Sequence, residues 1–253
     1  MKSSAVLAAA TLTTFASASA ATRIACVGDS ITAGSCSSGE PAFYPSQLQD
    51  LLDAEYGSGA YNVTNFGESG ATMQKKGDSP YWERASFPKL VAETWDIVVI
   101  MLGTNDAKDE GSGGPSNWQH DCATLADCVF AEDYKSMIDT VRSLGNPDIY
   151  IMVPPPLMED TIYGMNSTVI NSVYPSLIPA IQADNKGVLG PIDIFSALGG
   201  VADWTSAFPD SCSLDSPWAP CSNFCDEQSC DQCHPNDDGY AALAKAVQAG
   251  LGL

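Results

Sequence analysis

The sequence RIACVGDSIT, residues 23–32, runs from an apolar segment into a glycine, an aspartate and a serine. The apolar segment, Arg23 to Gly28, has the length and composition of a buried strand. Further strands are predicted at 61–66, 96–102, 148–153 and, more weakly, 188–194. Helical patterns separate them, at 44–55, 131–144, 166–184 and 238–251. Strands that alternate with helices predict an α/β protein whose parallel sheet is covered on both faces.

The chain of 253 residues suits one domain, and its first residues predict export. Residues 1–20 are typical of a signal peptide, with Lys2 at the positive end and an A-x-A cleavage site at 18–20. Their apolar stretch is shorter than the roughly 20 residues that span a bilayer, which disfavours a membrane anchor. We therefore expect a secreted domain at 21–253. Two sequons, at Asn62 and Asn166, are candidate glycosylation sites that could also be unused.

The composition is strongly acidic. Asp and Glu outnumber Lys and Arg by 31 to 11, which gives a formal net charge of −20 at pH 7. A surface of this sign repels nucleic acid and anionic membranes, so neither is expected as a partner. Solubility is the simplest role of the charge, and we expect a monomer.

Nine cysteines, an odd number, predict disulfides in an oxidising compartment. Cys26 lies in the first predicted strand and is the candidate for a free, buried thiol. Four bridges are expected among the other eight: Cys36, Cys122, Cys128, Cys212, Cys221, Cys225, Cys230 and Cys233. Cys122 and Cys128 form a candidate local pair, and the other pairings stay open. Several of these cysteines lie in a long irregular insertion at about 202–235, which is either functional or a disulfide-held surface loop.

A candidate nucleophile, Ser30, follows the first strand directly. In doubly wound sheets, ligands bind beyond the carboxyl ends of the strands, so this serine is expected at the ligand-binding edge. A glycine before it permits a sharp turn, and backbone N–H groups after the turn can receive an oxyanion. The simpler alternative is that Asp29 and Ser30 only cap a helix.

A nucleophilic serine needs a base, and the chain has two histidines, His120 and His234. His120 lies in the loop NWQHD and is interpreted as a surface residue. His234 follows Asp231 by three residues in DQCHP and precedes the last predicted helix. One turn of chain can therefore bring the Asp231 carboxylate to the imidazole nitrogen that does not face the serine, which is the orienting role of an acid in a catalytic triad.

Two further strand ends offer hydrogen-bond donors. Gly67 follows the second strand, where a glycine lets a backbone N–H approach a substrate. Asn105, in the GTND sequence after the third strand, carries a side-chain amide. Both could instead be ordinary turn residues, together with Asp106.

In this order, the signals resemble the SGNH, or GDSL, hydrolase superfamily. The resemblance runs from GDSIT at Gly28 through NFGESG at Asn65 and GTND at Gly103 to the D-x-x-H-P that begins at Asp231. It implies a flavodoxin-like three-layer α/β/α sandwich with a mostly five-stranded parallel sheet. The cysteine-rich insertion before the histidine departs from the usual pattern of the superfamily. There is no G-x-S-x-G sequence, so an α/β-hydrolase fold has no support.

The resemblance also implies roles for the site residues. Ser30 is the nucleophile, His234 the base and Asp231 the residue that orients the base. The oxyanion hole comes from the amides of Ser30 and Gly67 and the side chain of Asn105. The implied reaction is hydrolysis of a carboxylic ester through an acyl-enzyme, with no metal and no cofactor.

The sequence CDQCH at 230–234 offers competing interpretations. It matches the C-x-x-C-H pattern of c-type haem attachment, and Cys221, Cys225, Cys230, Cys233 and His234 could form a zinc cluster. Either would remove His234 from catalysis. The signal peptide and the pairable cysteines favour disulfides over both.

The stretch NFGESGATMQKKGDSPYW resembles the branch of the superfamily that contains sialate and other carbohydrate O-acetylesterases. This resemblance implies an acetylated sugar or polysaccharide as substrate. Trp82 and Trp118, with Tyr81, are candidate faces for stacking a sugar, although aromatic residues more often pack in the core; Asp29 is a further candidate substrate contact. The alternatives are a lipid or short-acyl esterase or lysophospholipase, and a catalytically silent carbohydrate-binding module.

Overall fold

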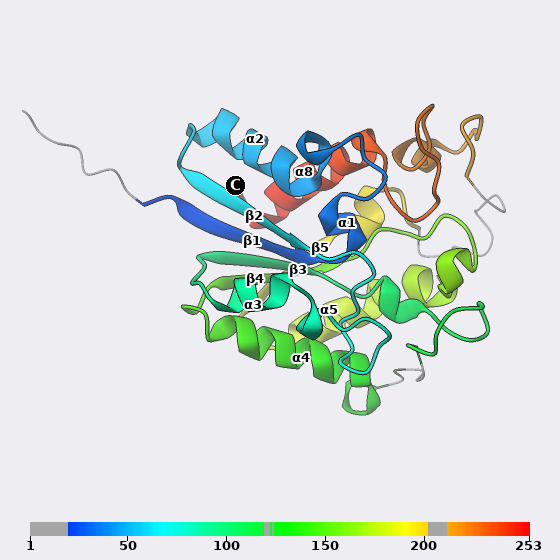
Figure 1. Cartoon of the computed structure of the whole chain (residues 1–253), viewed down its shortest axis with the longest axis horizontal. Coiled ribbons are helices and arrows are strands. Elements are labelled where there is room, and N and C mark those ends of the chain that lie inside the picture. Colours follow the sequence, from blue (N-terminus) through cyan, green and yellow to red (C-terminus); the bar gives the residue numbers. More distant parts are fainter. Residues whose placement is uncertain (1–19, 119–121, 123, 202–211) are drawn as a thin grey trace, which may run out of the picture.

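The computed structural model describes residues 20–118, 122, 124–201 and 212–253. In this part of the chain, parallel strands form one sheet in the order β2-β1-β3-β4-β5 (Figure 1). The strands are β1 Thr22–Gly28, β2 Tyr61–Gly67, β3 Ile97–Met101, β4 Asp148–Val153 and β5 Val188–Asp193. All the predicted strands are confirmed to within one residue at each end.

Helices cover both faces of the sheet, which gives the predicted three-layer sandwich. The helices α2 and α8 lie on one face, and α3, α4 and α5 lie on the other (Figure 1). Their bounds, with those of the short helices α1 and α6, are α1 Ser30–Ala33, α2 Tyr44–Tyr56, α3 Ser86–Val91, α4 Val129–Arg142, α5 Tyr174–Asp184, α6 Ile194–Ala197 and α8 Asp237–Leu251. None of the described helices is long and apolar enough to cross a membrane.

One predicted helix is divided. The pattern at 166–184 corresponds to a π-helical turn, Val169–Val173, followed by α5. Pro175, at the start of α5, has no N–H to donate to the preceding turn, and this accounts for the break in the regular hydrogen bonding.

The packing of the core explains why each strand is a continuous apolar run in the sequence. Successive side chains of a strand point to opposite faces of the sheet. Ala25 and Val27 pack in the core under α3, α4 and α5, whereas Ile24 and Cys26 pack in the core under α2 and α8. All four side chains are fully buried. A strand covered on both faces therefore shows no polar alternation.

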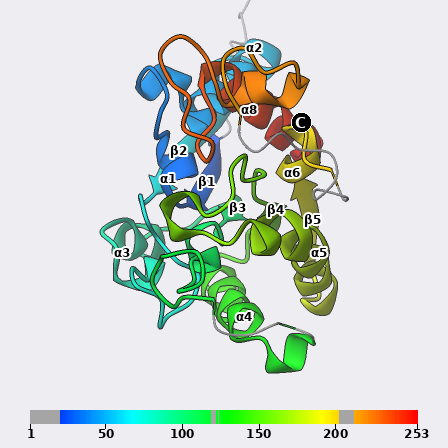
Figure 2. The ribbon, with the colours of Figure 1, turned by 90° about the vertical axis from the view of Figure 1, so that its right-hand side faces the viewer.

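The connections from β1 and β3 leave the sheet on opposite sides. From β1 the chain passes through α2 to β2, and from β3 it passes through α4 to β4, on the other face (Figure 1). The carboxyl ends of β1 and β3 therefore flank the topological switch point where ligands bind in doubly wound sheets. Figure 2 looks onto this edge, where α1 and the loops after β4 and before α8 gather.

The disulfides only partly match the prediction. Cys122–Cys128 is confirmed, and two further bridges, Cys212–Cys221 and Cys225–Cys230, tie the loop before α8. Cys26 is free and buried, as predicted.

The expected fourth bridge, which would use Cys36 and Cys233, is wrong. Both are free thiols. The buried Cys233 sulfur lies 3.9 Å from the sulfur of Met165, and the exposed Cys36 thiol donates a hydrogen bond to Asp231. The two sulfurs thus have different neighbours.

Both sequons lie in the described part of the chain. Asn62 is exposed on β2. The amide of Asn166 donates to Asp109 Oδ2 at 2.7 Å and accepts from the Thr168 N–H at 2.9 Å. Their glycosylation stays a prediction. The signal peptide and the role of the 202–235 insertion also stay predictions; residues 1–19 and 202–211 lie outside the described residues.

Candidate active site

Ser30 is the first residue of α1, directly beyond the carboxyl end of β1. Asp29 caps this helix by accepting a 3.0 Å hydrogen bond from the Ile31 N–H, so the capping interpretation holds for Asp29 but does not account for Ser30. A side chain at Gly28 would lie 2.0 Å from Thr32 Oγ1, so only glycine fits between β1 and α1. Ser30 is 8% exposed, so it is largely shielded from solvent.

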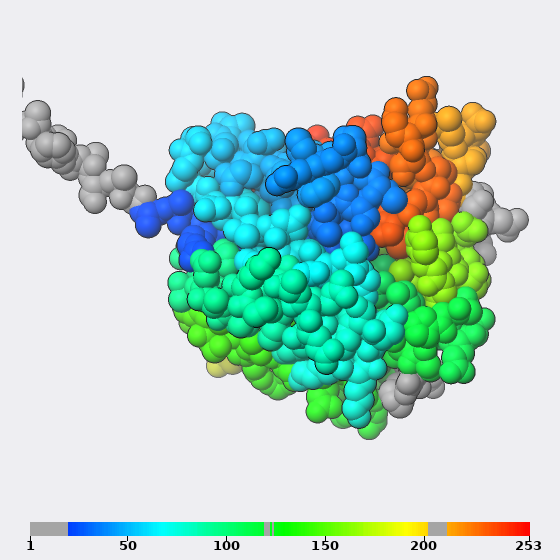
Figure 3. Space-filling model, viewed as in Figure 1, coloured from blue at the N-terminus to red at the C-terminus, as the bar shows by residue number. Residues whose placement is uncertain are grey.

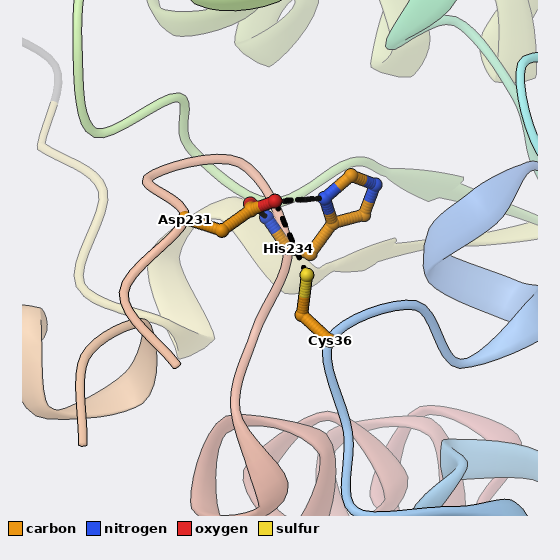
Figure 4. A group of neighbouring side chains, drawn as sticks. All are labelled: Cys36, Asp231 and His234. Atoms are coloured by element: carbon orange, nitrogen blue, oxygen red, sulfur yellow. Dashed lines mark hydrogen bonds and ion pairs between the residues drawn. The ribbon is translucent and has the colours of Figure 1, made fainter. Parts of the chain in front are cut away.

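The candidate base, His234, and the Asp231 carboxylate come from the loop that precedes α8 (Figure 4). His234 Nε2 lies 2.9 Å from Ser30 Oγ. On the other side of the ring, His234 Nδ1 lies 2.8 Å from Asp231 Oδ2 and 2.9 Å from Oδ1. The three residues that the sequence singled out form one hydrogen-bonded chain, in the geometry of a serine, a general base and an orienting acid.

The Asp231 carboxylate is held by further donors. The backbone N–H groups of Cys233 and His234 donate to Oδ1, and the Tyr163 hydroxyl and the Cys36 thiol donate to Oδ2 at 2.7 and 3.2 Å. Burial would raise the pKa of Asp231, but its hydrogen bonds and the charge of His234 outweigh burial and hold that pKa well below its usual range. Asp231 is therefore ionised at neutral pH and fixed in orientation.

The two predicted oxyanion donors lie at the ends of β2 and β3, the two strands that flank β1 in the sheet. Gly67 is paired with Gly28 across the β1–β2 ladder, and its N–H donates to Asn65 Oδ1 at 2.8 Å. A side chain at Gly67 would lie 2.2 Å from the backbone nitrogen of Ala33, so the β2 end requires glycine. Asn105 is 2% exposed, and its amide donates to the Ala71 carbonyl at 3.2 Å. Their role in catalysis stays a proposal.

Asp106 is not an ordinary exposed turn residue. It is fully buried, and its two carboxylate oxygens accept hydrogen bonds from the N–H groups of Met73 and Gln74 at 2.8 and 2.7 Å. The turn after β3 is thereby joined to the loop after β2. Asn117 extends this link, since its amide donates to the Asn105 carbonyl at 2.9 Å.

We expect the protein to be more stable at pH 5 than at pH 7.5, because burial raises the pKa of Asp29 to about 6 and that of Asp106 to about 7. Between about pH 4 and these values the folded chain holds protons that the unfolded chain releases. This stability is complete below pH 4 and is lost as the pH rises through 6 and 7. Asp231, with its lowered pKa, acts oppositely but only in more acid solution.

The free energy of unfolding should be higher at pH 5 than at pH 7.5 by an amount on the order of 2–4 kcal/mol, or about 5–10 °C in Tm. Thermal unfolding at both pH values measures it. Asp29→Asn cannot titrate, so its Tm should depend less on pH than that of the parent. A parent Tm that is equal or higher at pH 7.5 would contradict this account.

The aromatic residues proposed for sugar stacking are largely engaged elsewhere. Tyr81 is fully buried and donates to the Phe66 carbonyl at 2.7 Å, so its assignment as a stacking face is wrong. Trp82 donates to the Met73 carbonyl and packs on Phe87. Trp118 packs on aromatic rings of the core under α4 and α5. Both tryptophans are partly buried, and substrate contact by them or by Asp29 stays a prediction.

The metal-binding alternatives lose their ligands to disulfides. Cys221, Cys225 and Cys230 are oxidised, so neither the zinc cluster nor attachment of a haem through Cys230 and Cys233 fits. In the described part of the chain, one group has three possible metal ligands within 4.8 Å of one another: Cys36, Asp231 and His234 (Figure 4). These groups already satisfy one another by hydrogen bonds. His120 lies outside the described residues.

Sequence reasoning missed Tyr163 and misassigned Cys36. Both reach Asp231 from distant parts of the chain, 68 and 195 residues away. Tyr163 lies in an irregular segment with no periodic pattern, so no signal in the sequence marks it. Cys36 was assigned to a disulfide, but its position six residues after Ser30 could have placed it near the site.

A hydrogen-bonded Ser–His–Asp arrangement at the switch point of a doubly wound parallel sheet is the architecture of a serine hydrolase. The family model of the GDSL-like Lipase/Acylhydrolase family matches residues 26–242. The chain therefore belongs to this family of carboxylic ester hydrolases.

Similar proteins agree with this assignment. An acetylxylan esterase from Xylanibacter ruminicola is 41% identical over 123 residues, which are 48% of this chain and 22% of that protein. Among solved structures, an acetyl xylan esterase matches with TM-score 0.63 at 18% identity, over 90% of this chain and 99% of the other. A catalytic mutant of an acetylxylan esterase from Geobacillus stearothermophilus matches with TM-score 0.58 at 22% identity, over 92% and 94%. At these identities, the structural likeness shows the fold alone.

Proposed function

We propose that this chain is a secreted serine esterase that removes acetyl groups from carbohydrate. The observation that carries the chemistry is the hydrogen-bonded chain from Ser30 Oγ through His234 to Asp231. Signal-like residues at 1–20 and the disulfides support the proposed export.

In the proposed mechanism, His234 Nε2 takes the Ser30 proton while Oγ attacks the acetyl carbonyl carbon. The tetrahedral intermediate collapses, and His234 returns the proton to the departing sugar oxygen. A water molecule, deprotonated by the same nitrogen, then attacks the acetyl-serine and releases acetate. Asp231 stays ionised throughout and stabilises the imidazolium that forms in each step.

We assign the oxyanion hole to the N–H groups of Ser30 and Gly67 and the side-chain amide of Asn105. An amide nitrogen carries two hydrogens, and the Asn105 amide uses one of them on the Ala71 carbonyl. The Gly67 N–H would exchange its Asn65 acceptor for the substrate oxygen. One such donor typically contributes about 10²- to 10³-fold to kcat.

The proposed substrate class rests on charge and on similarity. The relative from Xylanibacter ruminicola, which is 41% identical over 123 residues, is named an acetylxylan esterase. A net charge of −20 disfavours anionic substrates such as acetylated sialic acid relative to neutral acetylated sugars. The described loops around the site are polar, acidic and cross-linked, which disfavours the lipid-esterase alternative.

A substrate panel tests this proposal. We expect hydrolysis of acetylated xylan and 4-nitrophenyl acetate, with kcat/KM at least tenfold lower for 4-nitrophenyl octanoate and for O-acetylated sialic acid. Preference for the octanoate would favour the short-acyl esterase or lysophospholipase. No hydrolysis of any ester by correctly folded protein would favour the silent binding module.

A further inference from the structure

Tyr163 joins the site from the segment after β4, in the short turn Ile162–Gly164. Its hydroxyl donates a 2.7 Å hydrogen bond to Asp231 Oδ2, and its ring packs in a tilted, edge-type contact with the His234 ring, with centroids 5.9 Å apart. Despite these contacts, 56% of Tyr163 is exposed. It therefore touches both members of the acid–base pair and also presents aromatic surface to solvent.

The backbone at this turn is strained. Tyr163 has φ +53° and Thr161 has φ +59°, in the left-handed region that residues with bulky side chains rarely adopt. Such conformations persist where the surrounding structure imposes them, and they concentrate at functional sites. Here the Asp109 N–H donates to the Gly164 carbonyl, and the Asn166 N–H donates to the Ala107 carbonyl. The segment after the GTND turn thus holds Tyr163 against the catalytic loop.

A groove of about 650 Å³, lined mainly by polar residues, begins at Cys36, the second side-chain donor to Asp231 Oδ2. Cys36 forms part of its wall and donates to the same carboxylate oxygen as Tyr163, so the Asp231 carboxylate links the groove wall to the tyrosine. Hydroxyl, amide and carboxylate groups line the rest of it: Ser37, Ser38, Asp226, Gln228, Ser229 and Asp237. The loop before α8 adjoins the segment after β4 in the space-filling view (orange and yellow-green in Figure 3).

We propose that Tyr163 has two separable roles in the esterase proposed above, on which this inference rests. Its hydroxyl is a positioning group for Asp231 and hence for His234. Its exposed ring is the platform on which the acetylated sugar stacks, since a pyranose presents an apolar C–H face that an aromatic ring covers well. The hydroxyl groups of the sugar then face the polar groove.

Three variants separate the two roles on two substrates, acetylated xylooligosaccharide and 4-nitrophenyl acetate. Tyr163→Phe keeps the ring, so we expect kcat to fall about 3- to 10-fold on both substrates and KM for the oligosaccharide to stay unchanged. Tyr163→Ala loses both groups, so KM for the oligosaccharide should also rise about tenfold, while KM for 4-nitrophenyl acetate stays within about twofold. Tyr163→Trp should restore KM but not kcat.

Tyr56→Ala is the matched control. Tyr56 is 43% exposed and ends α2 beside Tyr61, at the end of the sheet opposite the site, so this variant should match the parent. An unchanged KM for the oligosaccharide in Tyr163→Ala, or an equal rise in KM for both substrates, would overturn the proposal that the ring is a sugar-stacking platform. An unchanged kcat in Tyr163→Phe would overturn the positioning role. If the parent hydrolyses 4-nitrophenyl acetate but no acetylated sugar, the proposed substrate class fails and the platform with it, while the kcat comparison still decides the positioning role.

Discussion

Asp231→Asn is expected to lower kcat for 4-nitrophenyl acetate by about 10⁴-fold while leaving the fold intact. The Asp231 carboxylate accepts from His234 Nδ1, which leaves Nε2 without a proton and able to take one from Ser30. An asparagine can place its NH₂ group against Nδ1 and thereby favour the opposite tautomer, in which Nε2 carries the proton. The serine then has no base. His234→Ala should lose at least as much activity.

The matched control is Asp148→Asn, which makes the same change of charge. Asp148 is exposed at the start of β4, at the end of the sheet opposite the site, and should keep parent activity. Circular dichroism and thermal unfolding would establish that Asp231→Asn is folded. A folded Asp231→Asn variant with kcat within tenfold of the parent would show that Asp231 does not orient the base.

The strands could be predicted from the sequence because each is buried on both faces. Val98 and Ile100 point into one core and Val99 and Met101 into the other, so β3 reads as an uninterrupted apolar run. The helices were harder to predict from the sequence. The six-residue helix α3 is too short to show a helical period, and the π-helical turn before α5 keeps the apolar spacing of a continuous helix.

The hydrogen-bonded arrangement of Ser30, His234 and Asp231 could be predicted because these residues stand at positions that topology constrains. Ser30 directly follows a strand, and the three-residue spacing of Asp231 and His234 is itself enough to bring their side chains together. Tyr163 and Cys36 obey no such local rule. They reach Asp231 only because loops from opposite sides of the sheet converge on its carboxyl edge (Figure 2).

The cysteines show the same limit. Cys122–Cys128 could be predicted because two cysteines six positions apart can be joined by a short closed loop. The number of cysteines favoured a fourth bridge, but it gives no information on where Cys36 and Cys233 lie in the fold. One sulfur is exposed beside a carboxylate and the other is buried beside Met165. Burial likewise decided against Tyr81 as a stacking face, since its hydroxyl reaches a core carbonyl.

The central claim is that Ser30 is the nucleophile and that His234 activates it. Incubation with phenylmethylsulfonyl fluoride tests this claim most directly, because a serine oxygen activated by a base displaces fluoride and forms a stable sulfonyl ester. Intact mass spectrometry should show one sulfonyl adduct per chain, with fragmentation placing it on Ser30 and esterase activity falling in proportion to labelling.

The variant Ser30→Ala should show neither adduct nor activity, and His234→Ala should be labelled at least 100-fold more slowly. Labelling at another residue with loss of activity, or esterase activity that survives in Ser30→Ala, would contradict the account.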